Sequence, residues 1–322
     1  MHEEPRTSPQ RGELLLRVRA VSLNYRDIAL VEGTYLRPGR AGLIPVSDAA
    51  AEVVAVGEEV EEFRVGDRVM GSFTPRWFGG PRLPGRAEGC YGNQLDGWLT
   101  EYKVVSQEAV VRLPDALSFE EGATLPCAAV TAWNALAGPR PIRAGDTVLT
   151  LGTGGVSLFA VQLARALGAR VIATTSSPGK ATRLKALGAD AVVNYAEQSD
   201  WGAAVRELTD GRGVDRIVEV GGPATVGQSL KAIAFDQEIV LVGFLGQENP
   251  GIDYFDLMTS GARIRSVNVG DRPMLEAVAH VVACHAIAPI IDRVFPFVEA
   301  KGAFEHLQQA RHIGKVVIRV GD

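Results

Sequence analysis

The stretch that most constrains the fold of this chain is residues 147–157, Thr-Val-Leu-Thr-Leu-Gly-Thr-Gly-Gly-Val-Ser. Residues 148–151 predict a short buried strand, and an apolar run with helical spacing follows from 156 to 167. A strand, a glycine turn and a helix start in this order form a phosphate site, because glycine permits the tight turn and the helix N-terminus attracts negative charge. Ser157 replaces the third glycine of the usual fingerprint. The predicted phosphate-binding residues are Gly152, Thr153, Gly154, Gly155, Val156 and Ser157.

A glycine triplet also occurs in ordinary turns, so its context decides. Here the context is a regular alternation of strands, at 170–174, 191–195, 214–220 and 238–244, with helices at 180–187, 200–208 and 224–234. This alternation predicts a parallel sheet covered on both faces, which binds its ligand beyond the carboxyl ends of the strands. Residues 147 to about 269 are therefore predicted to form one dinucleotide-binding unit.

The residues after the second strand of this unit indicate which dinucleotide it binds. An NAD site usually has an Asp or Glu about 20 residues after the first glycine, which bonds the ribose hydroxyls. No acidic residue occurs between Gly152 and Asp190. Hydroxyls and cations suit a 2′-phosphate, which a carboxylate would repel, and this favours NADP(H). A solvated helix face is the alternative reading for the two cations of this set, which comprises Thr174, Thr175, Ser176, Ser177, Lys180 and Arg183.

Composition argues against several classes of partner. The chain has 322 residues, a formal net charge of −5, three Cys and five His. This length suits two domains with ample core, and mild acidity argues against nucleic acid as the main partner. The sequence shows no apolar run of membrane-spanning length, no signal-peptide pattern and no close pair of cysteines. We expect a cytoplasmic protein with neither a membrane nor a nucleic-acid partner.

The remainder of the chain reads as a β domain in two pieces. Residues 13–112 contain strand patterns separated by turns and a Gly-, Pro- and Arg-rich loop at 77–96, which predicts an antiparallel, barrel-like domain. Residues 118–137 are predicted to be helical, with Ser118 as N-cap, and to link the two domains. After 269 the alternation stops, and the last part of the chain is expected to return to the β domain.

Short motifs occur along the chain in order. They are Ser-Leu-Asn-Tyr-Arg-Asp at 22–27, Pro-Val-Ser-Asp at 45–48, Val-Gly-Asp-Arg-Val at 65–69, Leu-Pro-Cys at 125–127 with Thr-Ala-Trp at 131–133, the glycine turn at 152–157, Lys-Ala-Leu-Gly-Ala-Asp at 185–190 and Gly-Lys-Val-Val-Ile at 314–318. By this set the chain resembles the medium-chain dehydrogenase/reductase superfamily, specifically its zinc-independent quinone-reductase-like and enoyl-reductase-like branch.

The resemblance implies an α/β fold in two domains. Residues 125–269 would form a Rossmann domain with a doubly wound parallel sheet, and residues 1–124 and 270–322 a discontinuous GroES-like β-barrel catalytic domain. Hydride transfer would occur in the cleft between them. The strand near 263–269 would pair across a two-fold axis, so a homodimer is also implied.

Zinc-dependent alcohol dehydrogenases of the same superfamily bind catalytic zinc through Cys, His and a second Cys or Asp. By resemblance their first Cys falls on Asn24 here and their His on Ser47, so only Cys127 sits where a ligand is expected. A catalytic zinc needs three protein ligands, and an amide with a hydroxyl is a poor complement to one thiolate. We expect no bound metal, although Asp27 and Asp48 keep a zinc site open as an alternative.

Without zinc, the oxyanion or enolate formed in the reaction needs hydrogen bonds and a proton donor. Tyr35 is the first candidate, because Glu-Gly-Thr-Tyr at 32–35 resembles the segment that carries the proposed acid tyrosine of enoyl-thioester reductases. Asn24 is the second, and by resemblance it would bond the nicotinamide ribose or the substrate carbonyl. Tyr25 is an alternative acid. A packing role for Tyr35 and a turn role for Asn24 remain open.

The resemblance also implies further cofactor contacts. Lys180 and Tyr195 would hold the adenosine phosphate, and the nicotinamide end would be lined by Thr131, Phe244, Asn268 and Val269. The substrate pocket would be built from Tyr35, the 77–96 loop and residues near 268–274.

Three functions are compatible with these residues. The first is NADPH-dependent, zinc-independent reduction of a quinone or of an α,β-unsaturated carbonyl compound, an enone or enoyl substrate. The second is a zinc-dependent alcohol dehydrogenase, which predicts bound zinc. The third is a cofactor-binding scaffold or sensor with little catalysis, which predicts NADPH binding without turnover. The glycine turn and Tyr35 favour the first.

Overall fold

The computed structural model describes residues 6–35, 39–40, 42–82, 88–244 and 251–321. The chain divides into two compact units, Met1–Val130 with Gly270–Asp322, and Thr131–Val269. The first unit is therefore discontinuous, and its central interruption is the alternating segment of the sequence. Within the described residues, no helix is long and apolar enough to cross a membrane.

The first unit is built on a largely antiparallel sheet. Its strand order is β12-β13-β1-β2-β3-β5, and β4 pairs with β1; β12 and β13 run parallel. The elements are β1 (Glu13–Leu23), α1 (Tyr25–Val31), β2 (Asp48–Val56), β3 (Arg68–Gly71), β4 (Tyr102–Ser106), η1 (Gln107–Ala109), β5 (Val110–Arg112), α2 (Phe119–Ala123), η2 (Leu125–Ala129), α9 (Arg272–Cys284), β12 (Ile291–Pro296), η3 (Phe297–Glu299), α10 (Ala300–Gln308) and β13 (Lys315–Arg319).

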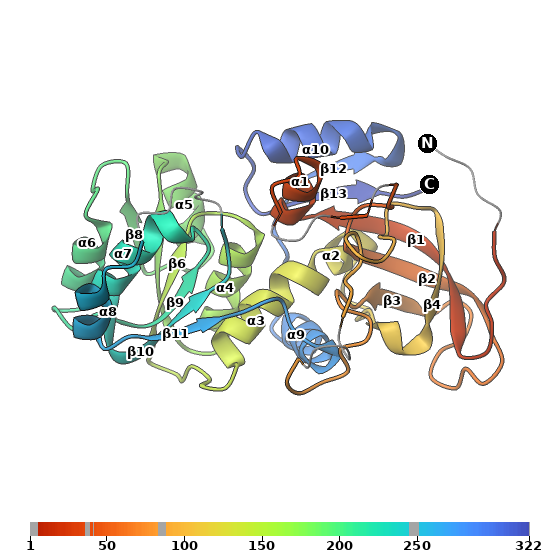
Figure 1. Ribbon diagram of the computed structural model, residues 1–322, viewed down its shortest axis with the longest axis horizontal. Coiled ribbons are helices and arrows are strands. Elements are labelled where there is room, and N and C mark those ends of the chain that lie inside the picture. Colours follow the sequence, from red (N-terminus) through yellow and green to blue (C-terminus); the bar gives the residue numbers. More distant parts are fainter. Residues whose placement is uncertain (1–5, 36–38, 41, 83–87, 245–250, 322) are drawn as a thin grey trace. The chain divides into compact units, whose positions relative to one another are not determined.

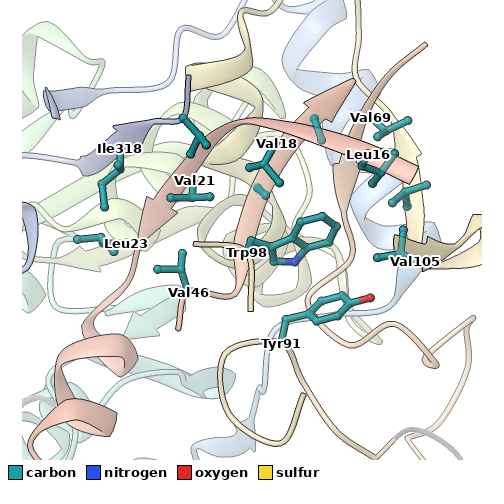
Figure 2. Close-up of a cluster of buried hydrophobic side chains, with 14 of the residues drawn as sticks. Leu16, Val18, Val21, Leu23, Val46, Val69, Tyr91, Trp98, Val105 and Ile318 are labelled. Atoms are coloured by element: carbon teal, nitrogen blue, oxygen red, sulfur yellow. The ribbon is translucent and has the colours of Figure 1, made fainter. Parts of the chain in front are cut away.

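The core of this unit follows from strand alternation along β1. Leu14, Leu16 and Val18 lie two residues apart, so they project from one face, and all three are fully buried. They belong to a cluster that includes the indole of Trp98, which packs edge-on against Tyr91 with 5.1 Å between the ring centroids (Figure 2). This core fixes β1, and with it the chain that leaves β1 at Leu23.

The second unit is a doubly wound Rossmann sheet. All of its strands are parallel, in the order β11-β10-β9-β6-β7-β8, and helices lie on both sides of the sheet (Figure 1). The strand order reverses at β6, the strand that carries the glycine turn. The elements are α3 (Val130–Ala137), β6 (Thr147–Leu151), α4 (Gly155–Ala166), β7 (Arg170–Thr175), α5 (Pro178–Ala186), β8 (Ala191–Asn194), α6 (Trp201–Glu207), β9 (Val214–Glu219), α7 (Pro223–Ala232), β10 (Ile233–Leu241), α8 (Tyr254–Ser260) and β11 (Arg263–Ser266).

Two predicted elements differ from the structure. The helix predicted at 118–137 is divided into α2, the π-helical turn η2 and α3. Pro126 lies in η2, and proline has no N–H to continue the regular helical ladder. The strand predicted at 238–244 begins earlier as β10, with a register shift between Ile233 and Glu238. Asp236 lies within this irregular stretch and has a left-handed φ of 62°.

Candidate functional site

The glycine turn lies at the carboxyl end of β6 and leads directly into α4. Gly152 has a φ of 73°, in the left-handed region that glycine adopts without strain, and Gly154 is the N-cap of α4. A Cβ added at either glycine would meet no atom within 4 Å. The buried Ser157 hydroxyl donates to the Leu151 carbonyl oxygen at 2.6 Å, and this bond closes the turn. The turn therefore leaves space beside Gly152 and Gly154 at the N-terminus of α4, the end of a helix that attracts a phosphate.

The other predicted residues of this turn lie beside its glycines. Thr153 is buried between the two glycines, and Gly155 and Val156 form the first turn of α4. The Gly152 N–H donates to the Thr174 carbonyl oxygen at 2.9 Å, which joins the turn to the end of β7. The six predicted phosphate-binding residues thus form one continuous structure.

The predicted adenosine-side residues gather at the ends of β7 and β8. Ser177 is the N-cap of α5, and its hydroxyl oxygen accepts from the Lys180 N–H at 3.5 Å. Ser176 beside it is exposed. Tyr195 follows β8, and its N–H donates to the Thr175 carbonyl oxygen at 2.9 Å. Hydroxyls, an ammonium and a phenol therefore share one end of this part of the sheet.

Glu219, at the carboxyl end of β9, is a residue that was not predicted from the sequence. It ends β9 and is fully buried. One carboxylate oxygen accepts from the Gly221 N–H at 2.8 Å, the Gly222 N–H at 3.1 Å and the Thr225 hydroxyl at 2.6 Å, and the other accepts from the Ser229 hydroxyl. This carboxylate shapes the turn between β9 and α7. An acid that ends a strand two residues before Gly-Gly-Pro was the available signal.

The remaining cofactor candidates in this unit lie on three elements. Thr131 is buried in α3, and Phe244 follows β10 half-buried. Asn268 is exposed after β11, whereas Val269 beside it is buried with a left-handed φ of 59°. The chain beyond Phe244 enters residues 245–250, which lie outside the described part of the structure.

The first unit contains a buried polar cluster around Asn24. The Asn24 Nδ2 donates to Asp48 Oδ2 at 3.0 Å, and its Oδ1 accepts from the Lys315 ammonium. Asp48 also accepts from the Ser47 hydroxyl at 2.7 Å and from the Cys127 N–H at 3.1 Å. The partners of Asn24 fix the orientation of its amide, with oxygen toward the cation and nitrogen toward the carboxylate.

The sheet brings these distant residues together. Asn24 follows β1, Asp48 begins β2 and Lys315 begins β13. The register pairs Ser22 with Asp48 and Leu23 with Val316, so the three side chains meet at one end of the same strands. Asp48 and Lys315 are missing from the predicted catalytic set, although both belong to the motifs that carried the resemblance.

Burial controls the charges of this cluster. Burial raises the pKa of Asp48, and the Lys315 ammonium together with hydrogen bonds from Asn24 and Ser47 opposes that rise. Burial also raises the pKa of Asp27 to about 6, against the opposing effects of Arg26 and the Asn24 N–H. The pKa of the Cys127 thiol is raised strongly by burial and by Asp48, so this thiol is neutral at pH 7.

Tyr35 lies at the far end of α1 from Asn24. Its N–H donates to the Ala29 carbonyl oxygen at 3.1 Å, and the Arg26 guanidinium lies 5.5 Å from its ring centroid. The side chain is half-buried. Asn24 is the N-cap of the seven-residue helix α1, so the two predicted catalytic residues flank this helix in the sequence. The predicted 77–96 loop includes residues 83–87, which lie outside the described residues.

The donor set at Asn24 does not suit zinc. It offers an amide, the Ser47 hydroxyl and the Cys127 thiol beside a resident cation, Lys315, whereas protein zinc sites are built from thiolate, imidazole and carboxylate ligands. In the part of the chain that the structure describes, no group of three or more His, Cys, Asp or Glu side chains is arranged to hold a metal. Both carboxylates of this cluster are already engaged, Asp48 by the Ser47 hydroxyl and the Cys127 N–H, and Asp27 by the Asn24 N–H at 2.8 Å.

Comparison with known proteins adds two family models and relatives that cover most of this chain. Residues 10–115 match the alcohol dehydrogenase GroES-like domain, and residues 155–283 match the zinc-binding dehydrogenase model. The zinc-type alcohol dehydrogenase-like protein C1773.06c of Schizosaccharomyces pombe is 39% identical and spans 96% of this chain and 91% of its own length.

Solved structures share the fold over 99% of this chain. An NAD-dependent alcohol dehydrogenase is 30% identical, with a TM-score of 0.88 over 95% of its own chain. A mycobacterial protein complexed with NADPH is 27% identical, with a TM-score of 0.82 over 94% of its chain. A quinone oxidoreductase of Pseudomonas syringae pv. Tomato DC3000 is 26% identical, with a TM-score of 0.81 over 94% of its chain.

Proposed function

This chain belongs to the medium-chain dehydrogenase/reductase superfamily, and from that premise we propose that it is an NADPH-dependent, zinc-independent oxidoreductase. Its proposed substrate is a small quinone or an α,β-unsaturated carbonyl compound, an enone or enoyl compound. The observation that carries the proposal is the buried Lys315 ammonium on Asn24, since by resemblance this is where zinc-dependent relatives hold their metal.

The cofactor preference rests on the residues around the end of β7. The amides of the glycine turn would receive the pyrophosphate. Ser176, Ser177 and Lys180 offer two hydroxyls and a cation to a 2′-phosphate, and Tyr195 lies on the next strand end. The compared structures include one NAD-dependent enzyme and one protein with NADPH, so the proposed preference rests on these local residues.

The proposed nicotinamide end lies on the other half of the sheet. The second half of a doubly wound sheet receives the second nucleotide of a dinucleotide. Thr131, Phe244, Asn268 and Val269 are the residues that we assign to it.

When bound, NADPH supplies the hydride. In the proposed reaction the hydride adds to the carbon β to the carbonyl, the enolate oxygen accepts hydrogen bonds, and a proton then adds to the α carbon and restores the carbonyl. The Asn24 Nδ2 donates to Asp48 at 3.0 Å and lies 3.5 Å from the Ser47 hydroxyl, and its second hydrogen is the donor that we assign to a substrate or ribose oxygen. Tyr35 is the proposed proton donor.

A zinc-dependent alcohol dehydrogenase is the second candidate, and the name of the Schizosaccharomyces pombe relative favours it. It requires zinc beside the Lys315 ammonium, a like charge that would repel the metal. A scaffold or sensor with little catalysis is the third candidate, and it differs from the first only in turnover.

The outermost strand of the Rossmann sheet, β11, supports the proposal of a homodimer. β11 pairs with β10 on one side and is an edge strand of the described sheet. Exposed apolar side chains accompany this edge, namely Phe235, Tyr254, Phe255, Met258 and Ile264. Unpaired edges and exposed apolar groups favour association with a second chain. We propose pairing of two β11 strands, and light scattering of the protein in solution tests it by mass.

The experiment that tests the cofactor assignment is a fluorescence titration of purified, metal-assayed protein with NADPH and with NADH. Tight NADPH binding, weak NADH binding and absence of stoichiometric zinc support the proposal. Tight NADH binding would remove the 2′-phosphate argument. Stoichiometric zinc would favour the alcohol dehydrogenase.

A further inference from the structure

Three neighbouring strands of the Rossmann sheet carry a network of paired charged side chains. Arg216 on β9 and Glu238 on β10 face each other in register and form an ion pair at 3.1 Å. The other Glu238 oxygen accepts from Arg265 Nε on β11 at 3.1 Å. Arg216 and Glu238 are buried. Buried charges carry a large desolvation cost unless they are paired, so this arrangement is held in one geometry.

Two arginines of this network also bond to α3 and to the segment that follows it. Arg216 donates to the carbonyl oxygens of Ala135 and Arg140. Arg265 donates to Asn134 twice, from Nη1 to the side-chain oxygen at 3.1 Å and from Nη2 to the carbonyl oxygen at 3.0 Å. These bonds fix the Asn134 amide so that its nitrogen points away from Arg265.

The Asn134 nitrogen ends the network on a strained residue. Its Nδ2 donates to the Val269 carbonyl oxygen at 2.7 Å. Val269 has a φ of 59°, a left-handed conformation that is unfavourable for a β-branched residue by about 1–2 kcal/mol. Such a conformation persists only where surrounding contacts impose it, and the Asn134 bond is a contact of this kind.

The topology indicates which half of a bound dinucleotide would lie nearer to Val269. β11 is parallel to β6, so the carboxyl ends of both strands point the same way, toward the side of the sheet that carries the glycine turn. The adenosine candidates follow β7 and β8, on one side of β6, whereas Val269 follows β11 on the other side. A dinucleotide with its pyrophosphate at the turn therefore extends its second nucleotide toward this side.

We propose that Asn134 and Arg265, braced by Glu238 and Arg216, are positioning residues for the nicotinamide half of the cofactor. They act through the backbone at Asn268 and Val269, which they hold in its left-handed turn. This inference rests on the proposed function. It adds residues on α3 and within the strands that do not themselves contact the cofactor. These residues set the affinity for the nicotinamide half and leave the affinity for the adenosine half unchanged.

The decisive variant is Asn134→Asp. A carboxylate of the same size can still accept from Arg265, but it cannot donate to the Val269 carbonyl oxygen and places a charge against it. The control is Asp215→Asn, the reverse exchange at a buried site. Asp215 accepts from the Thr147 N–H at 2.8 Å. Both residues lie at the amino ends of their strands, away from the carboxyl ends where the glycine turn lies.

Each protein is titrated with NADPH and with adenosine 2′,5′-bisphosphate, which lacks the nicotinamide half. We expect Asn134→Asp to weaken NADPH binding about tenfold, equivalent to about 1.4 kcal/mol, and to change bisphosphate binding less than about twofold. The Asp215→Asn control is expected to lower the melting temperature while leaving both affinities unchanged. Arg265→Lys, which loses the two-pronged contact, should give the same selective loss as Asn134→Asp.

Unchanged NADPH affinity in Asn134→Asp, or equal loss of both ligands, would overturn the inference. If Asn134→Asp fails to fold, Arg265→Lys carries the same comparison. Wild-type protein that binds NADH instead of NADPH would contradict the proposed cofactor, and the inference is then tested with NADH and AMP. Wild-type protein that binds no nicotinamide cofactor would overturn both.

Discussion

The Lys315 ammonium donates a hydrogen bond to the side-chain oxygen of Asn24, although 291 residues separate them in the sequence. A second bond from the same ammonium reaches the Leu23 carbonyl oxygen at 2.6 Å. Strand β13 therefore fixes both the position and the amide orientation of Asn24, the N-cap of α1. In the proposed enzyme, this cation also balances the buried carboxylate of Asp48.

Replacing Lys315 by Met is expected to lower the free energy of unfolding by about 3 kcal/mol, because it leaves the Asp48 charge buried without its cation. Thermal or urea unfolding at neutral pH measures this change. Lys185→Met is the matched control, since Lys185 is exposed on α5. Equal melting temperatures for the two variants would contradict the role of Lys315.

Replacing Lys180 by Ala is expected to raise the dissociation constant of NADPH about tenfold and that of NADH less than about twofold, because only NADPH presents a 2′-phosphate to the ammonium. Lys185→Ala on the same helix should change neither constant. Equal weakening of both cofactors would mean that Lys180 supports the loop and does not read the phosphate.

Replacing Gly154 by Val separates binding from folding. Gly154 has an extended backbone with φ of −75°, which valine adopts, and its Cβ would meet no protein atom. We expect an unchanged melting temperature and at least about tenfold weaker cofactor binding, because the side chain would occupy the phosphate volume. Gly227→Ala in α7, which also meets no atom, is the control and should retain binding. Full binding by Gly154→Val would place the pyrophosphate elsewhere.

Replacing Asp27 by Asn should change how stability depends on pH. The pKa of Asp27 is about 6 in the folded protein, because of burial, and near 3.9 in the unfolded chain. Between these two values the folded state binds the additional proton, so the stability of the wild type falls as the pH rises through this interval. An amide at 27 keeps an oxygen for the Asn24 N–H and carries no charge.

The stability of Asp27→Asn relative to wild type should therefore increase from about pH 4 to about pH 7. Urea unfolding of both proteins at the two pH values measures the difference. A difference that is constant with pH, or that changes in the opposite direction, would show that Asp27 does not have the raised pKa.

Local patterns were sufficient to predict the Rossmann unit. The glycine turn with Ser157, the alternation that follows it and the hydroxyls ending at Ser177 each depend on residues close in sequence. α1 was not predicted, although Asn24 followed three residues later by Asp27 is a recognisable helix-start signal. The break at η2 depends on Pro126, whose effect inside an apolar run was underestimated.

The polar networks could not be predicted, because they depend on strand register. Lys315 meets Asn24 only because β13 pairs with β1 at Leu23 and Val316. Arg216 and Glu238 interrupt apolar strands, and nothing local shows that the two face each other across neighbouring strands. In both networks the contact joins residues whose spacing in the sequence carries no periodic signal.

In the proposed reaction, the protein reduces its substrate with NADPH and without zinc. The most direct measurement is NADPH oxidation by chelator-treated, metal-assayed protein in the presence of an enone or a quinone. We predict turnover that survives chelation, exceeds turnover with NADH and falls in Tyr35→Phe. Activity that is lost on chelation and restored by Zn²⁺ would contradict this prediction.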